Sequence, residues 1–286
     1  MGNRYLIVNS DDFGFSREVN QAVVLAFRRG ILTSASLMAG GAAFRQAVIL
    51  AHDNPQLAVG IHITCVNGRS VLPAREIPHL VDRDGNFPSD PGLAGLKYFF
   101  CKRARKELFR EFEAQFEKFL ATGLACSHID SHCHMHVNPA VFEPLIALGA
   151  RYGIRRMRVP EDDFFAAAPY VQSRFATGVN AVVFKLLTAR MKPTLRKNGF
   201  RAPLKVYGNF LTGSMGRAYM LSMLEKLPAG VSEIYCHPAL LPGHAEHSSR
   251  ELQLLRELGI LLDTEVRSKI NRLGITPATY FDLDRY

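Results

Sequence analysis

The sequence has 286 residues, of which 48% are hydrophobic and 21% charged, and it carries a formal net charge of +9. This composition supplies a buried core and excludes an intrinsically disordered chain, and no apolar run approaches the roughly 18 uncharged residues that a membrane-spanning helix requires. The charge excess comes from one segment, because between Asp163 and Glu225 the sequence has no acidic residue but nine Lys and Arg.

Strands and helices are expected to alternate along the chain. Arg4–Ser10 is an apolar, β-branched run that stops at Asp11-Asp12-Phe13-Gly14, which predicts a buried strand followed by a turn. Ser16 can cap a helix over Arg17–Arg29, where apolar residues recur at helical spacing. Further strands are expected at Thr33–Ala39, Leu57–Thr64, Ser127–Asp130, Arg155–Val159 and Val231–Cys236, and further helices at Ala42–Ala51, Arg103–Thr122, Ala140–Tyr152, Ser249–Leu258 and Thr264–Leu273.

The alternation predicts the fold class. Strands that alternate with helices indicate an α/β fold with a parallel sheet and helical crossovers. The number of units favours a distorted (β/α) TIM-like barrel over a small open sheet. We expect a single domain over residues 1–286, with insertions at about 66–100, which is rich in Pro and Gly, and at 164–224, which contains the basic segment.

Polar residues gather where the predicted strands end. Asp11 and Asp12 end the first strand, His62 lies near the end of the third, Asp130–His136 (DSHCHMH) follow the next, and His237 follows Val231–Cys236. Parallel α/β folds place their active sites at the carboxyl ends of strands. We therefore expect these side chains to face one site.

The residue types at this site indicate metal-assisted hydrolysis. Two adjacent carboxylates repel each other unless a cation lies between them or one has a separate task. One carboxylate and two imidazoles form a three-ligand site with room for water and substrate, and a neighbouring carboxylate can deprotonate the bound water. His132, His134 and His136, at spacing two, would share one side of an extended segment, which core packing does not explain.

The same residues also allow other interpretations. An Asp-Asp pair after a strand is often a helix cap or turn, and His237 could be a structural histidine braced by Pro238. A non-haem Fe(II) oxygenase uses two histidines and one carboxylate, a metal-dependent phosphoesterase suits clustered His-x-His and Asp ligands, and a lipid-binding protein could retain a vestigial site. The residues alone leave open which of Asp11 and Asp12 is the ligand.

Several motifs closely resemble those of the YdjC-type carbohydrate deacetylases. Val8–Gly14 (VNSDDFG) is similar to their opening NADDFG, with Ser10 where the family usually has Ala. Other matches follow in the family's order and spacing over most of the chain: Gly30–Ser34, Gly60–His62, His128–His136, Arg158–Pro160 and Cys236–Ala239.

The resemblance implies a barrel enzyme that removes the acetyl group from N-acetylated sugars with one divalent ion, Zn²⁺ or Mg²⁺, and no organic cofactor. Asp12, His62 and His132 would be the metal ligands, Asp11 the general base, and His237 the acid that protonates the departing amine. The residues that would line or brace the site are Asp130, His134, His136 and Arg158.

The middle of the chain looks like the hopanoid-biosynthesis-associated, HpnK-like branch of the family, which implies an N-acetylglucosaminyl lipid as substrate. Chito-oligosaccharides are the alternative. Independently, Val182–Leu187 combines apolar residues with Lys185 and precedes Arg190, Lys192, Arg196 and Lys197, as in a segment resting on an anionic membrane. A solvated positive face is the simpler interpretation. Nucleic acid is not expected, because no recognition helix or aromatic stacking platform accompanies the charge.

The expected location is the cytoplasm, at the inner face of the membrane. The five cysteines are an odd number without disulfide-type spacing, and no charged-then-apolar leader precedes Arg4. These features predict a reducing compartment. The sequence leaves the oligomeric state open, a homo-oligomer included.

Overall fold

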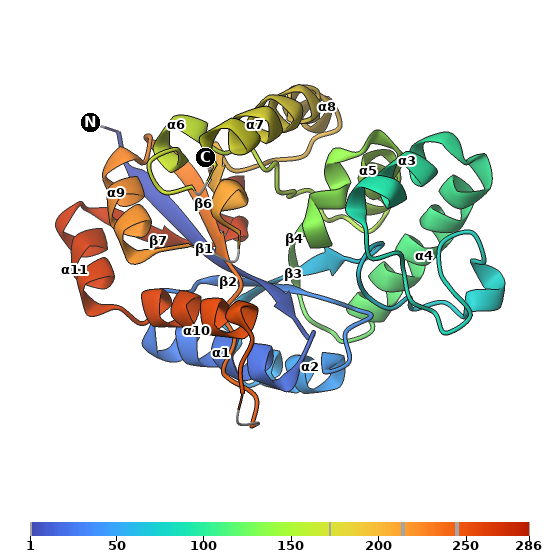
Figure 1. Ribbon diagram of the computed structural model, residues 1–286, viewed down its shortest axis with the longest axis horizontal. Coiled ribbons are helices and arrows are strands. Elements are labelled where there is room, and N and C mark those ends of the chain that lie inside the picture. Colours follow the sequence, from blue (N-terminus) through green and yellow to red (C-terminus); the bar gives the residue numbers. More distant parts are fainter. Residues whose placement is uncertain (1, 172, 213–214, 244–245, 286) are drawn as a thin grey trace.

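The computed structural model describes residues 2–171, 173–212, 215–243 and 246–285. A curled sheet lies at the centre, and helices surround it (Figure 1). The strands of the described residues are β1 (Arg4–Phe13), β2 (Ser34–Leu37), β3 (Ala58–Ile63), β4 (Cys126–Ser131), β5 (Lys205–Tyr207), β6 (Gly230–Cys236) and β7 (Ile275–Ala278).

Most of the predicted helices are confirmed, and their ends agree with the prediction within a few residues. Ser16 caps α1 as predicted, because its side chain accepts a hydrogen bond from the N–H of Val19. The α-helices are α1 (Arg17–Arg29), α2 (Phe44–His52), α3 (Pro91–Phe100), α4 (Lys102–Leu120), α5 (Pro139–Arg151), α6 (Phe164–Ala167), α7 (Arg174–Thr188), α8 (Met191–Lys197), α9 (Arg217–Lys226), α10 (Ser249–Leu261) and α11 (Thr264–Arg272). The 3₁₀ helices are η1 (Ala74–Glu76), η2 (His132–Val137), η3 (Asn209–Leu211) and η4 (Tyr280–Asp284). Within the described ranges, none of these helices has the length and apolar character to cross a bilayer.

Strand β1 is the centre of a parallel sheet with the order β4-β3-β2-β1-β6-β5. One edge of β1 pairs with β6 along Arg4–Ser10. The other edge carries β7 along Arg4–Ile7 and β2 along Asn9–Phe13. The strand runs three residues beyond its predicted end at Ser10, so Asp11 and Asp12 belong to the strand rather than to a following turn.

The barrel is irregular between β4 and β5. The prediction of a strand at Arg155–Val159 is wrong, because this segment forms only isolated contacts with its neighbours. Pro160 lacks the N–H that would extend a hydrogen-bonded ladder. Single bridges join Met157 to Ile129 and Arg156 to Arg201, and beyond Pro160 the N–H of Val206 donates to the carbonyl of Glu161. The predicted distorted TIM-like barrel is confirmed as a curled parallel sheet, a half-barrel whose open side this segment crosses.

The two predicted insertions differ in content. Residues 66–100 contain η1 and α3 between β3 and α4. Residues 164–224 contain α6, α7, α8 and most of α9, and they also supply β5 to the sheet. This strand has only three residues, which is too short for a periodic pattern to be visible in the sequence.

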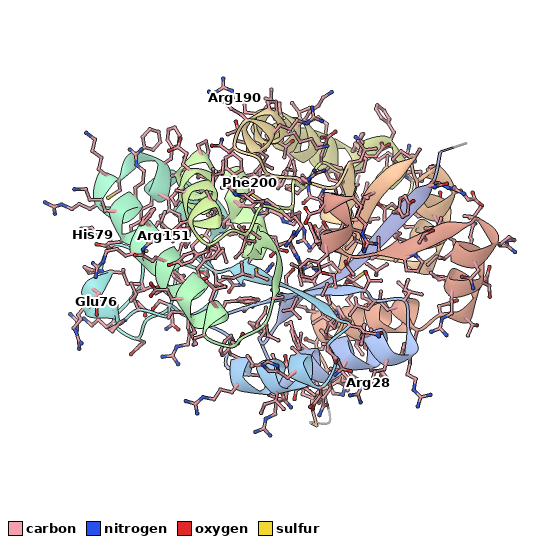
Figure 2. The ribbon with its side chains drawn as sticks, turned by 180° about the vertical axis from the view of Figure 1, so that it is seen from behind. Arg28, Glu76, His79, Arg151, Arg190 and Phe200 are labelled. Atoms are coloured by element: carbon pink, nitrogen blue, oxygen red, sulfur yellow. The ribbon has the colours of Figure 1, made fainter. Side chains whose placement is uncertain are left out.

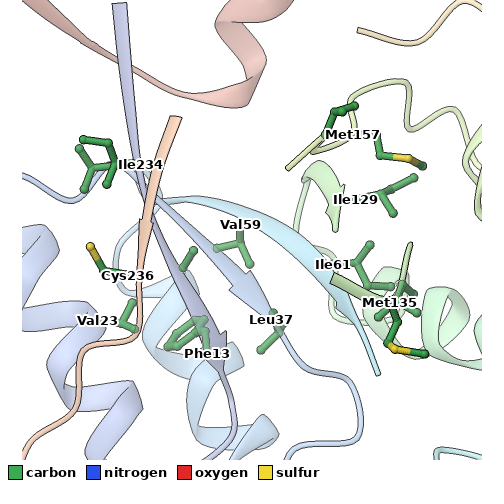
Figure 3. Packing of buried hydrophobic residues seen from close by; sticks show 14 of the residues in the cluster. Phe13, Val23, Leu37, Val59, Ile61, Ile129, Met135, Met157, Ile234 and Cys236 are labelled. Atoms are coloured by element: carbon green, nitrogen blue, oxygen red, sulfur yellow. The ribbon is translucent and has the colours of Figure 1, made fainter. Parts of the chain in front are cut away.

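The two faces of β1 have different surroundings. Successive strand residues point to opposite faces, and Leu6 and Val8 pack into the main core between the sheet and the helices. Figure 3 shows part of this core, with Phe13 and Cys236 near Val23 of α1. On the other face, an apolar cluster near the start of the strands consists of Ile7, Val231, Ala278, Tyr280 and Leu283. Farther along β1, that face carries polar side chains instead, and these build the site.

Candidate active site

A backbone kink at the end of β1 separates the two adjacent aspartates. Asp12 has a φ of 63°, in the left-handed region that few residues other than glycine adopt. Both side chains are buried, with 2% of Asp11 and 8% of Asp12 exposed. They have different partners: Asp11 contacts Arg158, whereas Asp12 contacts two histidines.

Asp12, His62 and His132 converge from three different strand ends. Oδ1 of Asp12 lies 2.8 Å from Nδ1 of His132 and 3.4 Å from Nε2 of His62. One potential ligand atom from each residue falls within 4.8 Å of the others, and all three side chains are buried. The three residues expected to bind the metal are therefore close enough to share one cation.

The electrostatics of this cluster favour a positive charge. Burial alone would lower the pKa of His62, but Asp130 and Asp12 raise it to about 10. Burial likewise opposes the charged form of His132, and the adjacent Asp12 raises its pKa well above the ordinary value. Burial would raise the pKa of Asp12, and the contacts with His132 and His62 instead hold it well below its usual range. The carboxylates therefore create a negative potential at the site, which a bound proton or metal ion would neutralise.

The three histidines after β4 point in different directions. Cys133 and His134 have φ values of 52° and 51°, so the chain turns at once after His132 and forms η2. The prediction of an extended segment with three histidines on one side is therefore wrong. Nε2 of His134 lies 2.8 Å from the hydroxyl of Tyr235, and Nδ1 of His136 lies 2.6 Å from Oγ of Ser131. Only His132 reaches Asp12.

Arg158 is the hub of a buried network of carboxylates. Its Nη1 and Nη2 donate to the two oxygens of Asp11 at 2.7 and 2.8 Å. Nη1 also lies 2.9 Å from Asp130, and Nη2 donates to Glu233 at 2.6 Å. Asp11, His62 and Asp130 form a second group with ligand-type atoms within 4.8 Å. Because Arg158 already binds both of these carboxylates, this group is less suited to a metal ion than the first.

The three carboxylates compensate the burial of Arg158. Burial alone would lower the pKa of this guanidinium, but Asp11, Glu233 and Asp130 raise it well above the ordinary value. Asp130 shows the reverse effect: burial would raise its pKa, yet Arg158 and His62 hold it well below. For Glu233 burial prevails and raises the pKa of the carboxyl, in spite of its contact with Arg158.

His237 completes the set at the end of β6. Its Nε2 lies 4.0 Å from Oδ2 of Asp11, and 17% of its side chain is exposed. Its backbone N–H donates to Glu257 of α10 at 2.7 Å, which fixes the chain immediately after the strand. Burial raises the pKa of Glu257, while His237 opposes that effect.

Two adjoining pockets open onto these residues. Their volumes are about 420 and 500 Å³, and Asp11, Asp12, His132 and His237 line both. Phe184 of α7 lines the larger pocket. Such volumes are in the range of small-molecule sites. The other residues that both pockets share are Asn67, Arg250 and Leu254.

Sequence reasoning missed the residues that hold the network together. Glu233 lies on the apolar strand β6, and a charge within such a buried strand is the signal that could have found it. Tyr280 of η4 donates a hydrogen bond to Glu233. No sequence pattern could indicate this contact, because the two residues are 47 positions apart. Asn9 donates to both Asp11 and Ser36, and the latter donates to Asp130 at 2.7 Å.

Sequence comparisons with known proteins find relatives that match nearly the whole chain. A "Carbohydrate deacetylase" from Geobacillus stearothermophilus is 32% identical over 280 residues, which cover 97% of each chain. A "Chitooligosaccharide deacetylase" from Salmonella paratyphi B is 27% identical and covers 98% of this chain and 99% of its own.

A solved structure shows a similar fold. The chain from Enterococcus faecalis V583, a proposed cellobiose-phosphate cleavage protein, superposes with a TM-score of 0.76 at 26% identity, over 98% of this chain and 99% of that one. The family model described as "YdjC-like protein" matches residues 5–272. The chain therefore belongs to the YdjC-like protein family.

Proposed function

We propose that this protein is a metal-dependent hydrolase that removes the acetyl group from an N-acetylglucosaminyl substrate. The main support is that two adjacent carboxylates have different partners: Asp11 is held by Arg158, and Asp12 contacts His62 and His132. The relatives named carbohydrate and chitooligosaccharide deacetylases support an acetamide on a sugar as the bond that is cleaved.

Asp12, His62 and His132 fit a divalent metal ion. Nε2 of His132 is buried and has no hydrogen-bond partner among the described residues, so it remains available as a ligand atom. One carboxylate and two imidazoles suit Zn²⁺, and the carboxylate also suits Mg²⁺. When bound, such an ion would polarise the acetamide carbonyl and lower the pKa of a bound water molecule.

In the proposed reaction, Asp11 and His237 move the protons. Asp11 takes a proton from a water molecule, whose oxygen attacks the acetamide carbonyl carbon. The C–N bond then breaks while His237 gives a proton to the departing nitrogen. The products are acetate and a sugar with a free amine. The separation of 4.0 Å between Nε2 of His237 and Oδ2 of Asp11 supports a base and an acid that act on the same reacting group.

Buried contacts position the proposed base, the proposed acid and one of the proposed metal ligands. Arg158 fixes the orientation of both Asp11 oxygens through two parallel hydrogen bonds. Glu257 holds the backbone of His237. Asp130 positions His62, since its Oδ1 lies 2.7 Å from Nδ1 of that ring and its Oδ2 contacts Arg158. Catalysis would therefore depend on these residues through geometry, without contact with the substrate.

An N-acetylglucosaminyl lipid, such as a glycosylated hopanoid, is the substrate that we propose in finer detail. Helix α7 supports it, because Phe184 lines the pocket next to His132, while Val182 and Leu186 are 60% and 70% exposed. A helix that lines the site and also exposes apolar side chains can contact the lipid part of an amphiphile. Chito-oligosaccharides are the alternative substrates.

The basic residues around α7 and α8 support attachment to an anionic membrane. Lys185, Arg190, Arg196 and Lys197 are exposed, and Figure 2 shows Arg190 at the edge of the molecule. Lys192 differs, because it forms an ion pair with Glu161 at 2.6 Å and is half-buried. Replacing Arg190, Arg196 and Lys197 by Gln should weaken binding to anionic vesicles and leave turnover of a short soluble substrate intact. Unchanged vesicle binding would remove this membrane surface from the proposal.

Mass spectrometry of the products tests the reaction and the substrate together. The purified protein is incubated with an N-acetylglucosaminyl hopanoid and, separately, with N-acetylated chitobiose. Loss of one acetyl group from the hopanoid supports the full proposal, and loss from chitobiose alone supports the deacetylase but rejects the lipid. Cleavage of the glycosidic bond without acetate release would reject a deacetylase. The Asp11→Asn variant is the matched control for a contaminating activity.

A further inference from the structure

Helix α3, like α7, exposes large apolar side chains. Leu93, Leu96 and Phe100 are 66%, 58% and 74% exposed, and the adjacent Phe99 is 47% exposed. The helix is nevertheless well anchored on its other face, where Tyr98 is fully buried and its hydroxyl donates to the carbonyl of Cys65 at 2.6 Å. The outward side chains therefore belong to an ordered surface.

The same stretch is strongly basic. Residues 91–106 contain five Lys and Arg and no acidic residue. All five lie among the exposed positions, and they are Lys97, Lys102, Arg103, Arg105 and Lys106. Glu107, the next acidic residue along the chain, is directed away from them and accepts a hydrogen bond from the backbone N–H of His79 at 2.7 Å. We call these five residues, together with Leu93, Leu96, Phe99 and Phe100, the α3 surface.

The α3 surface is attached to the segment that carries the site histidines. Asn138, which caps α5 directly after η2, donates to the carbonyl of Gly95 at 2.9 Å. Both α3 and α7 contact η2, and both lie in the upper half of Figure 1. A planar partner that contacts both helices would thus lie beside the site.

We propose that the α3 surface binds an anionic lipid bilayer. Exposed leucines and phenylalanines beside uncompensated cations match the boundary between acyl chains and anionic headgroups. A contact between two copies of this chain would place the five cations of one copy against those of the other if the face paired with itself, which is unfavourable. Binding to the bilayer builds on the proposed function, because it would hold the deacetylase on the bilayer that carries its lipid substrate. The binding itself requires no catalytic turnover.

Vesicle sedimentation with matched variants tests the proposal. The full chain is mixed with phosphatidylcholine vesicles that contain phosphatidylglycerol, and with vesicles of phosphatidylcholine alone. Leu96→Ser/Phe100→Ser should weaken binding to the anionic vesicles at least about tenfold. Lys102→Gln/Arg103→Gln/Arg105→Gln should weaken it about a hundredfold at low salt. The control is Ile49→Ser, which removes an apolar side chain that is 62% exposed on the distant helix α2 and should change nothing.

The competing outcomes are distinguishable. Equal binding by the α3 variants and the Ile49→Ser control overturns the proposal. If light scattering finds that Leu96→Ser/Phe100→Ser converts a dimer into a monomer while the parent chain ignores both kinds of vesicle, the surface is a contact between copies and the proposal is also overturned. Acetate release from soluble N-acetylated chitobiose is measured on the same samples. Failure of that reaction in the parent chain rejects the deacetylase without affecting the vesicle result.

Discussion

Arg158 and Asp11 form a two-point ion pair inside the barrel, with Nη1 and Nη2 of the guanidinium 2.7 and 2.8 Å from the two carboxylate oxygens. The pair joins the end of β1 to the irregular segment that crosses the open side of the sheet. Because Arg158 is fully buried and also contacts Asp130 and Glu233, it balances three carboxylates with one cation. The stability of the barrel and the orientation of the proposed base therefore depend on the same side chain.

Replacing Arg158 by Gln should cost about 3–5 kcal/mol of unfolding free energy, because it leaves buried carboxylates without their cation. Arg158→Lys retains the charge but not the planar fork, so it should recover only part of the stability. Urea unfolding measures both. The control is Arg151→Gln, which breaks an exposed ion pair with Glu113 and should cost less than about 1 kcal/mol. Similar losses for Arg158→Gln and Arg151→Gln would contradict the central role of Arg158.

The two adjacent aspartates should fail in different ways. Asp12→Ala removes the carboxylate that contacts both histidines, so the protein should no longer bind the proposed metal ion. Asp11→Asn leaves that cluster in place and should retain the metal, while the rate of acetate release falls at least about a hundredfold, the usual contribution of a general base. Metal content by plasma mass spectrometry and acetate release separate the two effects. An Asp11→Asn variant with near-normal activity would reject Asp11 as the base.

Much of the fold could be predicted because its signals are local. The run RYLIVNS, the cap at Ser16 and the helix that follows depend on residues that are close in sequence, and the structure confirms them. Arg155–Val159 misled the prediction because its apolar pattern is that of a strand, whereas Arg158 turns inward to three carboxylates and Pro160 cannot extend the pairing. Strand β5 was missed because three residues are too few for periodicity.

The site was predictable to the extent that its residues follow strands. Asp12, His62 and His132 lie at or after strand ends, and parallel pairing brings those ends together. The direction of the η2 side chains was not predictable, since it follows from left-handed backbone angles at Cys133 and His134. No pattern in the sequence marks either residue for that conformation, because neither is a glycine or an asparagine.

Asp162 should make stability depend on pH. Burial raises the pKa of this carboxyl to about 6, although the backbone N–H groups of Gly208 and Phe210 donate to it. A folded-state pKa above the unfolded value of 3.8 means that the folded protein holds the proton more tightly. The contribution of Asp162 to stability is therefore fully present below pH 3.8 and is lost as pH rises through about 6, at most about 3 kcal/mol.

The Asp162→Asn variant isolates this effect, because the amide does not titrate and retains one acceptor oxygen. Urea unfolding of both proteins from pH 4 to 7.5 should show that the parent chain loses stability relative to the variant as pH rises. A difference that stays constant over this range, or that changes in the opposite direction, would contradict the raised pKa.

A side chain at Gly60 should destabilise the protein, because the ring of His128 lies against this position and is held in place by its own contacts. A Cβ at this position would lie 2.3 Å from Cε1 of His128, far inside contact distance. That ring is stacked on Tyr280 with centroids 3.7 Å apart, and its nitrogens lie 2.8 and 3.0 Å from the hydroxyls of Ser127 and Ser36. Gly60→Ala should therefore lower the unfolding free energy by about 1–3 kcal/mol, the usual cost of overpacking.

The matched substitution Gly259→Ala should have the opposite sign. Gly259 lies within α10, and a methyl group added there would have no atom of another described side chain within 4 Å, so alanine should stabilise the helix by up to about 1 kcal/mol. Urea midpoints of the two variants give the comparison. The strain at Gly60 should also reduce acetate release, because His62 lies two residues farther along β3 and its ring must stay within 3.4 Å of Asp12. A Gly60→Ala variant that is as stable and as active as the parent chain would contradict this prediction. It would mean that the packing around His128 is looser than these contacts imply and does not hold His62 rigidly beside Asp12.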